Sequence, residues 1–148
     1  MGHAAMGHAT RRRFFLGVGR VVRRGPELYS PLMAANPKTT PTNVKAPHGA
    51  RVLEIAWQDG HTSRFPHQLL RGYCPCAGCQ GHSGTIAFHD GGNLDLRKLE
   101  PVGNYALSLE WGDAHASGIY SFGYLRLLGD LIEAHGDQLT TVHPELSR

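Results

Sequence analysis

Cysteine is scarce in this sequence, and the few cysteines present lie close together. There are three among 148 residues, at positions 74, 76 and 79. A secreted disulfide framework normally uses an even number of cysteines spread along the chain. Three in one short loop indicate thiolate metal ligation in a reducing compartment, so we expect a cytoplasmic protein.

Acidic residues are missing from the first 24 positions, which hold six arginines. The rest of the chain then has nine of the 15 Lys+Arg against all 12 Asp+Glu, so it is mildly acidic. A domain that binds nucleic acid needs a basic face that displaces counterions from phosphate. The charge distribution therefore argues against a nucleic-acid partner for the central part of the chain.

Long apolar runs and nucleotide-binding motifs are also missing. No run approaches the ~20 apolar residues of a membrane span, so no membrane segment is expected. Residues 10–17 resemble a twin-arginine export signal, but further arginines interrupt the apolar run that should come next. No G-x-x-x-x-G-K-[ST] or G-x-G-x-x-G motif occurs, so no phosphate-binding loop is predicted.

Two segments of loose composition flank a patterned centre. Residues 1–46 combine many Pro, Gly, Thr and Ala residues with little periodicity, which predicts a disordered basic and Pro-rich N-terminal tail. Residues 47–136 carry the strand and helix patterns and are predicted to form one domain. Residues 137–148 are predicted to be a C-terminal tail.

A repeat organises the central domain. The pattern L-x-[IL]-x-W-x-D-x-H-x-S occurs at residues 53–63 and again at 107–117, an offset of 54. A Leu-Arg pair comes after each copy, at residues 70–71 and 125–126. Each copy has the alternation of a half-buried β-hairpin, and a helical pattern comes after it. We therefore predict an α+β fold, a small two-layer sandwich of two related β-hairpin-plus-helix units with the cysteine loop inserted after the first.

The cysteine loop carries the strongest chemical signal in the chain. Cys74, Cys76 and Cys79 can wrap one ion, and zinc prefers four thiolate or imidazole ligands in a tetrahedron. An iron–sulfur site and metal-free thiols are the alternatives, although iron–sulfur clusters usually take four cysteines. Three cysteines and a histidine would fill all four positions, which predicts a structural zinc ion rather than a catalytic one.

Three histidines, His61, His82 and His115, compete for the fourth position. His82 lies three residues after Cys79 and could close a very local site. A helix laid back across the first unit would bring the cysteine loop beside the hairpin turn of the second unit, which favours His115. His61 would then be a solvent-facing copy with no loop to bind.

Several motifs occur in a fixed order along the chain: Leu53–Trp57 with Asp59-Gly60, Leu70-Arg71, Cys74-Pro75-Cys76 with Cys79, Gly103–Leu107, Trp111-x-Asp113-x-His115 and Gly118-Ile119-Tyr120. Together they resemble the gamma-butyrobetaine hydroxylase-like N-terminal domain family over about residues 47–128. The resemblance implies a two-layer α+β domain with a zinc ion held by four residues, which match Cys74, Cys76, Cys79 and His115. The second turn departs from the family's D-G-H, because Ala114 stands where the glycine is usual.

The resemblance also sets the functional expectation. In the hydroxylases this domain precedes a 2-oxoglutarate oxygenase domain, and other members are fused to P-loop ATPases that carry iron–sulfur clusters. We therefore expect a non-catalytic zinc-binding accessory or interaction domain whose partner is another protein. A role in iron–sulfur cluster assembly or delivery is the alternative that the fusions suggest. A small stand-alone metalloenzyme is disfavoured, because a fully ligated ion has no open position and the sequence offers no convincing acid–base set.

Overall fold

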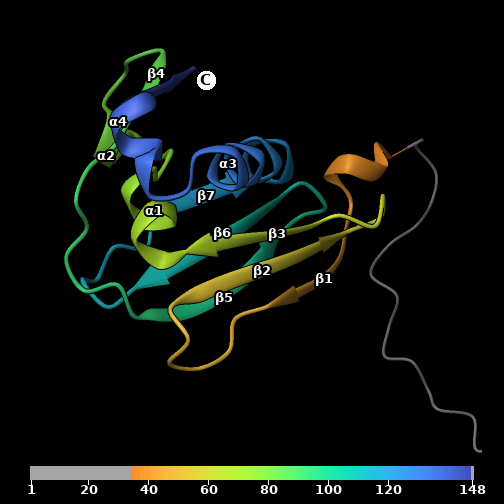
Figure 1. Cartoon of the computed structure of the whole chain (residues 1–148). Helices are drawn as coiled ribbons and strands as arrows, with labels where there is room; N and C mark the ends of the chain where they lie inside the picture. The colour runs from red at the N-terminus through yellow and green to blue at the C-terminus, as the bar shows by residue number, and fades with distance from the viewer. Residues whose placement is uncertain (1–34, 148) are drawn as a thin grey trace, which may run out of the picture. The chain divides into compact units, whose positions relative to one another are not determined.

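The computed structural model describes residues 35–147, which contain three small antiparallel sheets (Figure 1). The first sheet has the order β1 (Pro41–Lys45), β2 (Val52–Trp57), β3 (Thr62–Pro66). The second sheet has the order β5 (Leu96–Val102), β6 (Ala106–Trp111), β7 (Gly118–Ser121). The third sheet is a single pair, β4 (Thr85–Ala87) with β8 (Glu145–Ser147).

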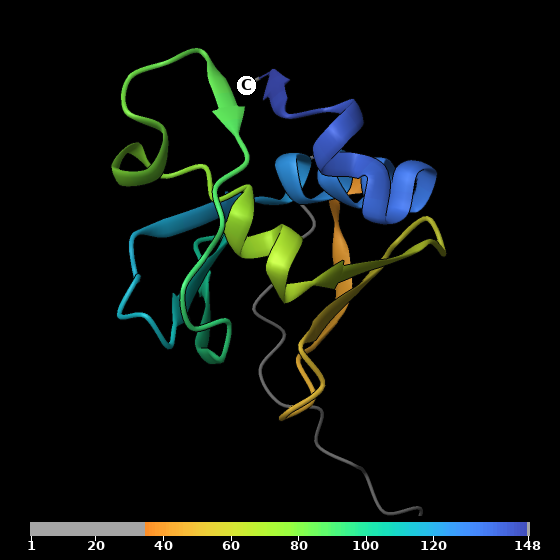
Figure 2. The same ribbon diagram turned by 60° about the vertical axis from the view of Figure 1, so that its left-hand side comes forward.

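Each three-stranded sheet runs directly into a helix. Helix α1 (His67–Gly72) comes after β3, and α3 (Phe122–His135), the main helix, comes after β7. The remaining helical segments are short: η1 (Pro37–Thr39), α2 (Ala77–Gln80), η2 (Gly136–Gln138) and α4 (Leu139–Val142). Figures 1 and 2 show helices α1, α3 and α4 gathered on one side of the long strands. The predicted α+β class is confirmed, with three antiparallel sheets and one main helix.

Alternating apolar residues give the two central strands one buried face each. Successive side chains of a strand point to opposite faces, so every second residue can enter the core. The buried positions are Leu53, Ile55 and Trp57 on β2 and Leu107, Leu109 and Trp111 on β6. Leu125 and Leu128, one helical turn apart on α3, are fully buried in the same hydrophobic cluster. One core therefore joins both three-stranded sheets to the main helix.

The sequence repeat corresponds to equivalent structure. Strands β2 and β6 are related by the offset of 54 residues, and α1 and α3 begin 55 residues apart. We call β1–β3 with α1 the first half, and β5–β7 with α3 the second half. Both halves have the same strand order and the same connection from third strand to helix. The strand that begins each half, β1 or β5, is an edge strand that the sequence repeat does not include.

The two halves hold each other's turns. Arg71 of the first half donates to Asp113 in the β6–β7 turn, with Nη2 at 2.9 Å from Oδ2. Arg126 of the second half donates to Asp59 in the β2–β3 turn, with Nη1 at 2.8 Å from Oδ2. Each arginine belongs to one copy of the repeated Leu-Arg pair, and each aspartate to the other half's copy of the hairpin motif. The contact is therefore reciprocal.

The first residue of each helix likewise packs against the opposite half. The ring of His67 packs edge-on against Trp111, with centroids 5.3 Å apart. The ring of Phe122 packs edge-on against Trp57, with centroids 6.5 Å apart. Edge-to-face contacts at these separations are favourable for aromatic rings. Each helix thus begins on the central tryptophan of the opposite half.

Both segments assigned to tails contain ordered elements, which corrects the predicted boundaries. Within 1–46, η1 and β1 are formed, and β1 pairs with β2. Within 137–148, α4 and β8 are formed, and Leu139 and Leu146 are buried. Strand β1 was not predicted because of the proline-rich composition of residues 1–46. An edge strand tolerates proline, since it needs fewer backbone N–H donors, and β1 buries little of its surface. Residues 1–34, with the export-like segment, lie outside the described residues.

None of the helices from residue 35 to residue 147 is long and apolar enough to cross a membrane.

Candidate metal centre

The loop between α1 and β4 carries the three cysteines. Helix α1 ends at Gly72, and Pro75 disfavours helical conformation at Cys74, so the chain cannot continue the helix there. Cys76 is the N-cap of α2, and its Sγ accepts a hydrogen bond from the backbone N–H of Cys79 at 3.3 Å. The short helix α2 therefore fixes Cys76 and Cys79 relative to each other.

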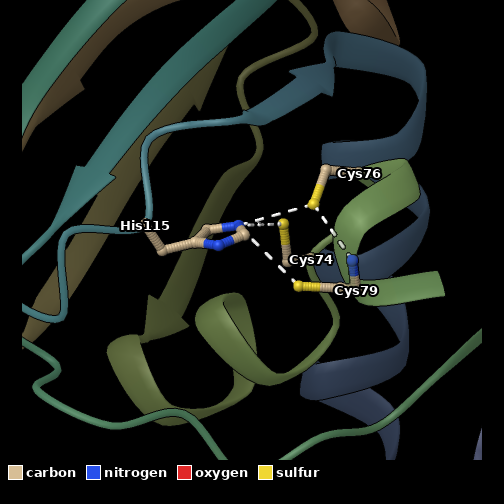
Figure 3. Close-up of side chains that lie close together, drawn as sticks. All are labelled: Cys74, Cys76, Cys79 and His115. Atoms are coloured by element: carbon tan, nitrogen blue, oxygen red, sulfur yellow. Dashed lines mark hydrogen bonds between the residues drawn. The ribbon is translucent and has the colours of Figure 1, made fainter. Parts of the chain in front are cut away.

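His115 reaches the same point from the β6–β7 turn (Figure 3). Its Nε2 lies 3.2 Å from Sγ of Cys74, 3.5 Å from Sγ of Cys76 and 3.7 Å from Sγ of Cys79. An imidazole nitrogen has one hydrogen or one lone pair, so it cannot bond well to three sulfurs at once. Zinc–ligand bonds of about 2.3 Å to sulfur and 2.1 Å to nitrogen in a tetrahedron place these atoms about 3.5 Å apart. The three distances fit the ligand shell of a single ion.

The three thiols differ in how readily they ionise. Burial raises the pKa of Cys74 to about 12. Burial opposes ionisation of Cys76 too, but hydrogen bonds from the Ser117 hydroxyl and the Cys79 N–H outweigh it and lower the pKa to about 7. Zinc binds the thiolate, so Cys76 is the sulfur best prepared to bind first at neutral pH. A bound divalent cation would then reverse the effect of burial on its neighbours.

The histidine is held in the form that a metal requires. Burial lowers the pKa of His115, and the nearby positive charge of Arg71 lowers it further. The imidazole is therefore neutral at pH 7, as metal ligation demands. The backbone N–H of His115 donates to Oδ1 of Asp113 at 3.1 Å, which anchors the turn.

Arg71 connects this anchor to the cysteines. Its side chain is only 11 % exposed, and Nη1 lies 3.6 Å from Sγ of Cys79 while the guanidinium bonds Asp113. Three thiolates around a divalent ion carry one net negative charge. A buried guanidinium beside one sulfur offsets this charge and donates a hydrogen bond to it.

Sequence reasoning missed three residues that shape the loop. The buried Gln80 side chain donates to the Cys74 carbonyl at 2.9 Å and accepts from the Ala87 N–H at 2.8 Å, so it ties the loop to β4. Gly118 leaves room for a sulfur, because a Cβ there would lie 3.1 Å from Sγ of Cys74. Ser117, the third, donates to Cys76, and its place in the repeat was a signal that went unused. Gly118 belongs to a motif of the family resemblance, but the motif does not reveal its contact with Cys74. Gln80 had no signal, since its role depends on contacts across the fold.

The structure brings together the four residues expected as ligands, Cys74, Cys76, Cys79 and His115, with donor atoms within 4.8 Å of one another. His82, the alternative fourth ligand, is exposed and lies outside this group. The expectation for His61 is wrong, because its side chain is only 27 % exposed and faces α3. The turn before His115 keeps its conformation without glycine: Ala114 has φ +64°, and the equivalent Gly60 has φ +87°.

Comparison with solved structures supports the fold. A comparison with curated proteins found no significant match. A crystal structure of a protein of unknown function from the DUF971 family of Acidithiobacillus ferrooxidans is 35 % identical, covers 64 % of this chain and 98 % of its own, and superposes with a TM-score of 0.51. Two NMR solution structures are 30 % and 25 % identical, with TM-scores of 0.53 and 0.51. They cover 74 % and 69 % of this chain, and 84 % and 82 % of their own lengths.

The family assignment rests on more than half of the chain. Residues 44–126 match the family described as gamma-butyrobetaine hydroxylase-like, N-terminal. The matched range begins at β1 and ends within α3, so it contains most of both halves and all four residues of the candidate metal centre. The chain therefore belongs to the gamma-butyrobetaine hydroxylase-like N-terminal domain family.

Proposed function

We propose that this protein is a non-catalytic accessory domain in which Cys74, Cys76, Cys79 and His115 hold one structural zinc ion. The observation that carries the proposal is the placement of three sulfurs 3.2–3.7 Å from one imidazole nitrogen. Four protein ligands complete the tetrahedron that zinc prefers and leave no position for a reacting water. The close spacing favours a single ion over an iron–sulfur cluster, whose several irons hold their cysteine ligands further apart.

The proposed ion has a structural task in this fold. Three of its ligands come after α1 of the first half, and the fourth lies in the turn between β6 and β7 of the second half. We take the halves to be related units of a two-layer sandwich, joined at one end by the metal. Free thiols that bind zinc are typical of reducing compartments, which supports a cytoplasmic location.

Zinc content tests the first part of the proposal. Protein prepared without oxygen should hold about one zinc per chain by elemental analysis, and Cys76→Ser should lose it. His82→Ala is the matched control and should retain the full content, because His82 is exposed and outside the ligand group. Metal-free wild-type protein, or iron with inorganic sulfide in place of zinc, would refute the proposal.

An exposed apolar surface beside the metal loop supports an interaction role. Tyr105 and Ile119 are 56 % and 49 % exposed, and with Pro75 they line a pocket over β7 and the start of α3. Tyrosine and isoleucine at such exposure are candidates for a protein contact, because aromatic and apolar anchors dominate interfaces. We propose that the partner is a protein that covers this surface.

A matched pair of variants tests the surface. Ile119→Glu places a charge in the apolar pocket, and Leu127→Glu places the same charge at a similarly exposed position on α3 (46 % exposed). A partner captured from the native host by wild type and Leu127→Glu, but not by Ile119→Glu, would use the proposed surface. Equal capture by all three proteins would exclude it.

A further inference from the structure

Helix α3 of the second half presents polar side chains to His61, whereas the loop that comes after the first half presents cysteines to His115. His61 and His115 occupy the same place in the repeat, and each backbone N–H donates to the preceding aspartate at 3.1 Å, Asp59 or Asp113. Both imidazoles point their Nε2 toward residues that come after the arginine of the repeated Leu-Arg pair. The surroundings of the two histidines are thus duplicated.

The groups that face His61 are two carboxylates on α3. Nε2 of His61 lies 3.3 Å from Oε2 of Glu133 and 3.9 Å from Oδ1 of Asp130. This nitrogen is buried and makes no well-formed hydrogen bond within the part of the chain that the structure describes. Asp130 and Glu133 are three residues apart, so they lie on the same face of the helix. One imidazole nitrogen and two carboxylates therefore converge on one point.

We propose that His61, Asp130 and Glu133 form a second metal site, which takes a divalent first-row cation through nitrogen and oxygen. Their donor atoms lie within 4.8 Å of one another, the same limit that holds for the cysteine site. Two carboxylates balance the charge of a divalent ion. Imidazole and carboxylate are the ligand types that manganese, iron and zinc ions share, whereas thiolates select softer ions.

The neighbouring arginine does not exclude a cation. Arg126 donates to Oδ1 of Asp130 at 2.9 Å, just as Arg71 approaches Sγ of Cys79 at the cysteine site. A carboxylate has two oxygens and about four lone-pair sites, so Asp130 can accept from Arg126 and still ligate an ion. The arginine of each half thus contacts both the aspartate of the opposite turn and one proposed ligand that comes after it in the chain.

The donor set indicates an open, exchangeable site rather than a closed one. Three protein ligands leave positions for water, and Asp130 and Glu133 are themselves 53 % and 69 % exposed. Such a site binds more weakly than four ligands that enclose zinc. Manganese(II) is therefore the appropriate probe, because it accepts oxygen and nitrogen ligands and does not compete for the thiolates.

Manganese titration of the zinc-loaded full chain tests the proposal. Free manganese is measured by electron paramagnetic resonance, and wild type should bind one ion per chain. His61→Ala and Glu133→Gln should each weaken binding by about tenfold or more, as loss of a ligand does. Glu133→Gln alters one exposed helix residue, so it keeps the fold even if His61→Ala disturbs the turn.

The controls separate this site from other acidic surface and from the zinc site. His89→Ala and Glu100→Gln alter an exposed histidine and an exposed glutamate elsewhere, and both should bind manganese like wild type. Zinc content is measured in every sample, so failure of the cysteine site is seen independently. Manganese binding that is absent in wild type up to millimolar concentration, or is unchanged in both His61→Ala and Glu133→Gln, would overturn the proposal.

Discussion

The two halves of the domain share one framework and differ in the segment after the arginine of each Leu-Arg pair. After Arg71 the helix ends at the next residue, and the chain enters the cysteine loop. After Arg126 the helix continues for nine residues to His135. Pro75 explains the early end of α1, whereas in α3 the N-cap Ser121 accepts from the Tyr124 N–H and no proline interrupts the helix.

This difference decides which donors meet the histidine of the opposite turn. A broken helix delivers three sulfurs to His115, and an unbroken one delivers two carboxylates to His61. The turns themselves are the same, with an aspartate that caps the histidine N–H and an arginine from the other half. Equal frameworks can thus carry unequal chemistry when the segment after a helix start is free to vary.

The largest expected effect is loss of the metal that distinguishes the first half. Removal of zinc with a chelator, or Cys76→Ser, should lower the free energy of unfolding by more than about 4 kcal/mol, because loss of a structural metal is among the few changes with effects this large. The effect is smaller than the ~10–16 kcal/mol of zinc-finger peptides, because this domain has a hydrophobic core of its own. Denaturant unfolding measures it, and re-addition of zinc should restore the chelated wild type. An unchanged midpoint would contradict the prediction.

Replacement of the two equivalent histidines comes next. His115→Ala should lower zinc affinity by about tenfold or more, because one of four ligands is removed. His61→Ala should leave zinc at the cysteine site, because its nitrogen faces α3 instead. Metal-competition titration compares these variants with His82→Ala. A loss confined to His82→Ala would show that the site is closed locally within the loop.

The two arginines should differ in one property and agree in another. Arg71→Gln and Arg126→Gln should both lower the melting temperature, since each removes a bond that holds the opposite turn. Only Arg71→Gln should also weaken zinc binding by several-fold, because Arg71 alone of the two lies beside a cysteine sulfur. Equal zinc affinity in the two variants would show that the guanidinium does not stabilise the thiolates.

The two turns predict unequal responses to exchange of glycine and alanine. Gly60→Ala should cost about 1 kcal/mol, because a side chain is strained at φ +87° even though the space around it is open. Ala114→Gly should be neutral within about 0.5 kcal/mol, since relief of strain at φ +64° offsets the added freedom of the unfolded chain. Thermal unfolding of the two variants measures the asymmetry, and a neutral Gly60→Ala would refute it.

The smallest expected effect is on the pH dependence of stability. It arises from His67, the first residue of α1, whose counterpart at the start of α3 is Phe122. Burial lowers the pKa of His67, whereas its counterpart Phe122 does not titrate. The unfolded state then binds more protons in acid, so stability is lost as the pH falls below the ordinary histidine pKa of about 6.5. His67→Phe should show a shallower fall in melting temperature between about pH 7 and pH 5.

Zinc content at each pH provides the control for His67→Phe, because protonation of the ligands also releases metal. The comparison uses only the pH range in which wild type and variant retain equal zinc. Identical slopes for the two proteins in that range would show that titration of His67 does not affect folding. The hydrogen bond that the variant loses, between His67 Nδ1 and the Leu94 carbonyl, should lower stability by a similar amount at every pH.

The repeat made much of this architecture readable from sequence. The shared pattern at 53–63 and 107–117 predicted both hairpins, and the cysteine spacing predicted three of the four residues that converge. The arginines of the repeated Leu-Arg pair make the reciprocal contacts. The repeat alone, however, does not predict whether each arginine contacts the turn of its own half or that of the opposite half. Only the packing of the halves decides that.

Other features were not readable for physical reasons. Strands β1 and β8 bury few side chains, so periodicity gives almost no signal for them. The carboxylates that face His61 lie far along the chain, on a helix whose polar side chains look like ordinary solvent-exposed residues. Their relation to His61 exists only after α3 has packed across the first sheet.

The reciprocal contacts of Arg71 and Arg126 with the opposite turns also affect how the chain folds. Arg71 and Asp113 are 42 residues apart, and Arg126 and Asp59 are 67 apart, so both contacts wait for long loops to close. Neither half can complete its own turn. A chain cut in the loop between β4 and β5 should therefore give two fragments that are incomplete alone and restore each other by complementation, as the partners of a dimer do.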